Sequence, residues 1–116
     1  MMARWAGLAV AAWLLAQVPG AAAADKFFAF NLTTATNFTG LALAPEGTEN
    51  WGPNQALNDP DHVLDASERL TLKGIQRGRF DVKLQTKKGC IVIKHGVDLT
   101  HDLTFDIRDG DLGGCR

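Results

Sequence analysis

Two histidines are the residues whose type and spacing most directly suggest chemistry. His95 and His101 flank a predicted turn at Gly96–Thr100, so the two imidazoles are expected to face each other across a hairpin. With a neighbouring aspartate they would offer ligands to copper or zinc. The alternative is that both rings are simply exposed beside a turn. His62 falls on a different predicted segment and joins neither arrangement.

The acidic clusters and the single serine form no catalytic grouping. The segment Asp106–Asp111 lacks the glycine and glutamate positions of a calcium-binding EF-hand loop, and its Asp-Gly pair favours a tight turn instead. Ser67 is the only serine, and it is not set in a Gly-x-Ser-x-Gly elbow. No glycine-rich phosphate loop precedes a helix. We therefore expect no catalytic residues, no cofactor and no enzymatic activity.

The first 24 residues have the pattern of a secretory signal. Arg4 supplies the positive start, Trp5–Val18 is an apolar run, and Ala22–Ala24 provides small residues for cleavage before Asp25. The run is short for a membrane span and no second apolar stretch follows it. An uncleaved N-terminal anchor is the alternative. The pattern predicts a periplasmic or extracellular protein without a membrane span after cleavage.

Size and charge limit the remaining possibilities. Removing 24 of the 116 residues leaves 92, which corresponds to a single domain over residues 25–116. Arg4 is the only charged residue of the leader, so 11 of the 12 basic side chains remain against 13 acidic ones. This balance provides no electrostatic footprint for nucleic acid. The partners to expect are a protein, a peptide or a carbohydrate.

Both cysteines, Cys90 and Cys115, lie in the predicted mature chain. An exported chain meets an oxidising compartment, so a disulfide between them is expected. A bridge closing a loop of about 25 residues stabilises a fold by about 3 kcal/mol in the chain-entropy model. A redox pair or a thiolate metal site is the alternative, but there is no Cys-x-x-Cys motif or metal-ligand spacing around either cysteine.

Short alternating segments separated by turn residues predict an all-β fold. The expected strands are Lys26–Leu32, Phe38–Ala44, Arg69–Ile75, Phe80–Thr86, Cys90–Lys94 and His101–Ile107. The clearest is Phe80–Thr86, where apolar and polar residues alternate strictly. About six strands, each with one apolar face, must stack or curl to bury those faces, which predicts a small antiparallel β-sandwich.

The long segment Pro45–Ser67 interrupts this strand rhythm. It predicts at most a turn or two of helix and is either a functional loop or a crossover between sheets. As a functional loop it offers Trp51, Asn54 and Gln55 as a candidate binding surface, because an exposed indole flanked by amides suits a sugar, peptide or protein. As a crossover it would use Trp51 and Leu57 to cap one end of the core.

Three short motifs, Phe28–Thr33, Glu49–Asn54 and Phe80–Leu84, together with the leader, resemble a family of small exported proteins found mainly in alphaproteobacteria. The resemblance implies a β fold and an exported location, and it implies no activity. Some similar chains carry an argininosuccinate lyase label. That enzyme is a long helical protein with a serine-rich loop, which a 92-residue β domain with one serine does not resemble.

These patterns together predict a non-catalytic binding or structural module. The alternative is a periplasmic copper- or zinc-binding protein that uses His95 and His101.

Overall fold

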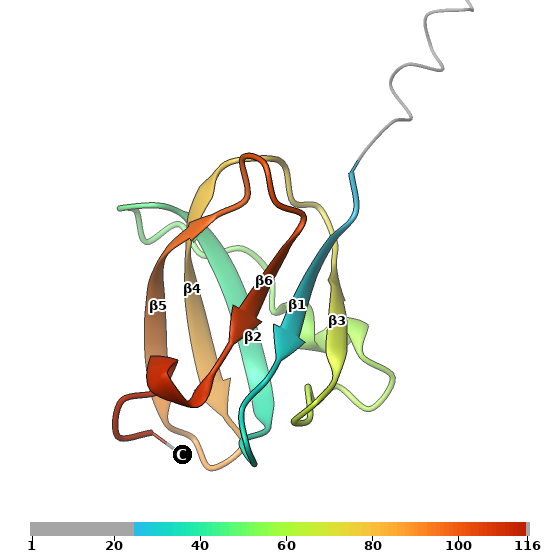
Figure 1. Cartoon of the computed structure of the whole chain (residues 1–116), viewed down its shortest axis with the longest axis vertical. Helices are drawn as coiled ribbons and strands as arrows, with labels where there is room; N and C mark the ends of the chain where they lie inside the picture. The colour runs from blue at the N-terminus through green and yellow to red at the C-terminus, as the bar shows by residue number, and fades with distance from the viewer. Residues whose placement is uncertain (1–24, 116) are drawn as a thin grey trace, which may run out of the picture.

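The computed structural model describes residues 25–115, so the predicted leader (residues 1–24) and Arg116 lie outside the described residues. Within them the chain forms six strands and two short 3₁₀ helices (Figure 1). The strands are β1 (Phe27–Asn31), β2 (Phe38–Pro45), β3 (Arg69–Leu72), β4 (Arg79–Thr86), β5 (Ile91–Asp98) and β6 (Thr104–Ile107). The 3₁₀ helices are η2 (Gln55–Asn58) and η3 (Asp109–Asp111). The predicted all-β fold is confirmed.

The strands form two three-stranded sheets, with the orders β3-β1-β6 and β2-β4-β5. Three of the four strand pairings are antiparallel, as predicted. The fourth is parallel and joins β1 to β6, with Phe28 beside Thr104 and Asn31 beside Ile107. The chain leaves β5 in one sheet and crosses to the other, so β6 enters beside β1 running in the same direction. No helix among residues 25–115 is long and apolar enough to cross a membrane.

The inward faces of the two sheets meet in one core. On β1 the residues pointing inward are Phe27 and Ala29, both buried. Phe28, on the opposite face, is half-buried beneath the Arg69 guanidinium, which lies 4.7 Å from its ring centroid. The other large buried apolar side chains are Phe38, Leu41, Leu43, Leu64, Leu70, Leu72, Val82, Leu84, Val97, Leu99, Phe105, Ile107 and Leu112.

A buried asparagine ties the end of β1 to two other segments. The Nδ2 atom of Asn31 donates hydrogen bonds to the carbonyl oxygens of Thr36 (2.8 Å) and Leu64 (3.1 Å). Its Oδ1 atom accepts from the backbone N–H (3.1 Å) and the hydroxyl (2.7 Å) of Thr33. The amide is completely shielded from solvent and both of its ends are satisfied, which is the condition for burying such a group.

Strand β5 is longer than predicted, and the predicted turn at Gly96–Thr100 is wrong. The register passes from Val82 opposite Lys94 to Phe80 opposite Val97, so Asp81 faces two residues of β5. This is a β-bulge, and Gly96 in it has a φ of +70°. The glycine that suggested a turn therefore provides a left-handed backbone position inside a continuing strand.

The C-terminal segment is held against β5 by two links. Cys90 and Cys115 lie at disulfide distance, with their Cα atoms 5.8 Å apart, so the predicted pairing is present. The Nζ atom of Lys94 is 2.9 Å from the Oδ1 atom of Asp111 in η3. Strand β5 is an edge strand, and exposed edges can pair with strands of other chains. Three features oppose such pairing: the inward-facing Lys94, the bulge at Gly96 and the C-terminal segment linked through Cys115.

Candidate functional site

The outer face of the β2-β4-β5 sheet is built from cross-strand rows. The register places Gly40, Gln85 and Ile91 in one row, Ala42, Lys83 and Ile93 in the next, and Ala44 and Asp81 in the third. The loop after β2 lies along this sheet, because the Gly52 N–H donates a 2.9 Å hydrogen bond to the Leu43 carbonyl. That loop brings Trp51 onto the outer face.

Trp51 is half-buried and does not belong to the core cluster. The Nζ atom of Lys83 lies 4.9 Å from the centroid of the Trp51 ring, a cation–π contact. The indole is therefore oriented over the sheet by a neighbouring cation. Part of the Trp51 surface remains open to solvent. The indole is therefore neither the fully buried core cap nor the freely exposed side chain that the two interpretations of this segment predict.

Two large apolar side chains on β5 extend this surface. Ile91 is 58% exposed and Ile93 is 38% exposed. A depression of about 160 Å³ lies beside Ile91, with Lys83 and Gln85 also in its lining. Gly40 forms part of its floor, where a Cβ atom would lie only 3.0 Å from the Cβ of Gln85. We call the surface formed by Trp51, Lys83, Gln85, Ile91 and Ile93 the Trp51 face.

Asn54, predicted as a binding residue, bonds to the protein's own backbone. Its Oδ1 atom accepts from the N–H groups of Leu41 and Ala56, both at 3.0 Å. Its Nδ2 atom donates to the Thr39 carbonyl at 2.9 Å. Asn54 therefore caps η2 and closes the edge of β2 at the same time. An asparagine directly before a short helical segment is the sequence signal for such a cap.

Gln55 is buried, and its side-chain amide pairs with the backbone of Lys73 in the way a neighbouring strand would. Its Nε2 atom donates to the Lys73 carbonyl and its Oε1 atom accepts from the Lys73 N–H, both at 2.9 Å. The Oε1 atom also accepts from Asn58 at 2.7 Å. Of the three residues predicted for contact, Trp51 alone keeps side-chain surface without a hydrogen-bonding role in the fold.

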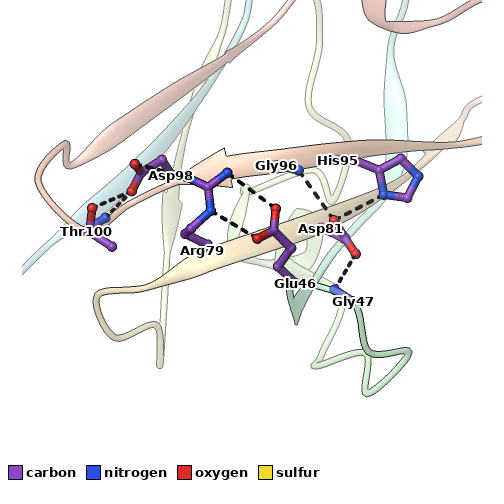
Figure 2. A network of polar contacts seen from close by, with 8 residues as sticks. All are labelled: Glu46, Gly47, Arg79, Asp81, His95, Gly96, Asp98 and Thr100. Carbon is purple, nitrogen blue, oxygen red and sulfur yellow. Dashed lines mark hydrogen bonds and ion pairs between the residues drawn. The ribbon is translucent and has the colours of Figure 1, made fainter.

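A second polar cluster centres on Asp81 at the bulge of β5 (Figure 2). Its Oδ2 atom accepts from the Gly47 N–H at 3.0 Å. Its Oδ1 atom lies 3.1 Å from the Nδ1 of His95 and accepts from the Gly96 N–H at 3.4 Å. The Gly47 N–H, with smaller contributions from His95 and Gly96, holds the pKa of Asp81 below its ordinary value.

Arg79 extends the cluster along the sheet (Figure 2). Its guanidinium donates to both carboxylate oxygens of Glu46, at 3.0 and 3.4 Å, and to Asp98 at 3.2 Å. Glu46 raises the pKa of Arg79. The hydroxyl and backbone N–H of Thr100 lower the pKa of Asp98, with Arg79 adding to the effect. These pairs fasten the loop after β2 to β4 and β5.

The two histidines predicted as a metal pair occupy different parts of the fold. His95 lies on β5 with its ring largely exposed and its Nδ1 against Asp81. His101 follows the end of β5, in the connection to β6. The hairpin that was expected to bring them face to face does not form. Within residues 25–115, no three or more His, Cys, Asp and Glu side chains are grouped so as to hold a metal ion.

The fold and the surface define a small all-β domain with two three-stranded sheets, a linked C-terminal segment and one partly apolar sheet face. Comparison of the chain with protein-family models, curated proteins and solved structures found no match. Its function is therefore inferred from its own surface.

Proposed function

We propose that the protein is an exported, non-catalytic binding module, periplasmic or extracellular, whose Trp51 face docks on a protein partner. The single observation that carries this proposal is the exposure of two isoleucines, Ile91 and Ile93, on the same sheet face as Trp51.

The composition of the Trp51 face favours a protein over a small ligand. Its depression of about 160 Å³ is below the range of about 300 to 1,000 Å³ that small-molecule pockets occupy. Aromatic side chains are enriched at protein interfaces, whereas adjacent large apolar side chains are unusual on a free surface. Lys83 is already oriented by the indole, so docking would cost little side-chain freedom there.

The exported location is supported by two independent features. The leader pattern of residues 1–24 directs a chain across a membrane. The Cys90–Cys115 pair at disulfide distance suits an oxidising compartment.

Site-specific photo-crosslinking in the producing organism tests the docking surface. A photoreactive amino acid replaces Gln85 in the Trp51 face, and a matched chain carries it at Thr71, an exposed position on β3 of the other sheet. We expect one discrete protein adduct from position 85 and none from position 71. The adduct should disappear when Trp51→Ala is added. Equal adducts from both positions, or none from either, would rule out a protein partner at this face.

A further inference from the structure

A second surface, separate from the Trp51 face, lies at the end of the sandwich where β2 stops and β4 begins. In Figure 1 this is the upper end, crossed by the connection from β3 to β4. Two adjoining depressions of about 340 and 490 Å³ share Pro45, Gly74, Ile75 and Phe80 in their walls. We call the combined depression the end groove. It has none of the residues that define the Trp51 face.

The floor of the end groove is apolar and continuous with the core. Ile75 and Phe80 are partly buried and pack against the core cluster. Leu43, Pro45 and Pro53 complete the apolar lining of the narrower part. A volume of about 340 Å³ lies within the range that small ligands occupy, and mostly apolar walls with few polar groups are typical of such pockets.

All three charged side chains lining the end groove are basic: Lys73, Arg77 and Arg79. Two of them are already neutralised, since Arg77 lies 2.8 Å from Asp25 and Arg79 pairs with Glu46. Lys73 makes no ion pair within residues 25–115. Its backbone is fixed by the two hydrogen bonds to Gln55, so the unpaired ammonium is carried on a fixed part of the rim.

We propose that the end groove binds an amphipathic carboxylate, a ligand with an apolar chain and one anionic end. The chain lies on Ile75 and Phe80, where it covers apolar surface that is otherwise open to water. The carboxylate lies beside the Lys73 ammonium, the lining cation that has no acidic partner among residues 25–115. Complementary charge selects this ligand against a cationic or neutral amphiphile with the same chain.

Three eight-carbon probes used below their micelle concentrations test this assignment: octanoate, octylamine and octanol. In NMR titrations of the purified protein, octanoate is expected to saturate and to shift the amides of residues 73–80. Octylamine should bind more weakly than octanoate. Lys73→Gln should lower octanoate affinity about two- to fivefold, the range of an exposed charge pair, and leave octanol affinity unchanged.

Two controls separate the end groove from other effects. Lys88→Gln, at the exposed β4–β5 turn, should keep the octanoate affinity of the unmodified chain. Ile93→Ser, in the Trp51 face, should also keep the octanoate affinity of the unmodified chain. The two proposals are therefore tested independently: a negative crosslinking result at the Trp51 face does not affect the end groove, and a negative octanoate titration does not affect the Trp51 face. The assignment is overturned if octanoate does not saturate, if octylamine binds equally well, or if the shifted amides lie away from the residues that line the end groove.

Discussion

Asp81, near the start of β4, accepts a 3.0 Å hydrogen bond from the backbone N–H of Gly47, 34 residues earlier in the chain. The bond joins the loop after β2 to the strand beside it. The carboxylate is buried, and its pKa is lowered chiefly by that N–H group. Protonation of Asp81 would weaken its hydrogen bonds to Gly47, Gly96 and His95.

Acid should therefore destabilise the domain through Asp81. Its pKa is lower in the folded than in the unfolded chain, so the unfolded chain takes up the proton first as the pH falls. The stabilisation is complete above the ordinary aspartate pKa of about 3.9 and is lost as the pH falls through the lowered folded value. Urea unfolding measures this from about pH 5 downwards. The free energy of unfolding should fall less steeply with decreasing pH for Asp81→Asn than for the unmodified chain. Equal slopes would mean that Asp81 is not responsible.

Replacing Asn31 with leucine should cost about 2 to 3 kcal/mol of unfolding free energy. The substitution removes one of the two donors to each of the Thr36 and Leu64 carbonyls, which keep the Thr33 hydroxyl and the Phe38 N–H. It also removes the side-chain acceptor of the Thr33 N–H. Chemical denaturation measures the loss. Asn50→Leu is the matched control, because Asn50 is exposed and the change should alter stability by about 0.5 kcal/mol or less. Similar losses at both positions would contradict the role of the Asn31 amide.

Substitutions of Asn54 and Trp51 should affect different properties, stability and partner docking respectively, although the two residues lie three positions apart. Asn54→Ala removes three hydrogen bonds to backbone groups and is expected to cost about 2 kcal/mol of stability. Trp51→Ala removes a half-buried ring and its contact with Lys83, so it should cost about 1 kcal/mol and abolish the crosslink at position 85. Thermal unfolding combined with the crosslinking assay distinguishes them. A larger stability loss at Trp51 than at Asn54 would make the indole a packing residue.

Removing the disulfide should lower the unfolding free energy by about 3 kcal/mol, the value for a loop of 25 residues. The double variant Cys90→Ser with Cys115→Ser should unfold at a lower urea concentration than the oxidised chain. Reduction of the unmodified chain should reproduce that shift. An unchanged midpoint in both experiments would show that the bridge does not restrict the unfolded chain.

The sequence predicted those features of the fold that depend on local alternation. Leu70 and Leu72, or Val82 and Leu84, are buried because a period of two directs alternate side chains to one face. The cysteine pairing could also be predicted, since two cysteines allow one intramolecular bridge and the leader pattern favours an oxidising compartment. The sheet order and the parallel β1–β6 pairing could not be predicted, because they depend on contacts between segments far apart in sequence.

The candidate site could be predicted only in part, because it too depends on contacts between segments far apart in sequence. Trp51 could be singled out by its residue type, but the exposed isoleucines of β5 join it through strand register, which no local pattern encodes. The alternation in Phe80–Thr86 puts Asp81 on the polar side of its strand, whereas in the fold the loop after β2 and the bulge at Gly96 cover it. A glycine can serve a turn or a bulge equally well, so Gly96 alone does not determine where β5 ends.

The parallel pairing of β1 with β6 has a consequence for the order of events in biogenesis. Strand β1 finds its first neighbour in β3, but residues 28–31 find their second neighbours only in residues 104–107. The central strand of that sheet therefore stays bonded on one side alone until more than seventy further residues have emerged. A ribosome, which delivers the chain from its N-terminus, thus holds an incomplete sheet for most of synthesis. Because pairing between segments so far apart in sequence forms slowly, the sheet that contains β1 can be completed only after residue 107 has emerged.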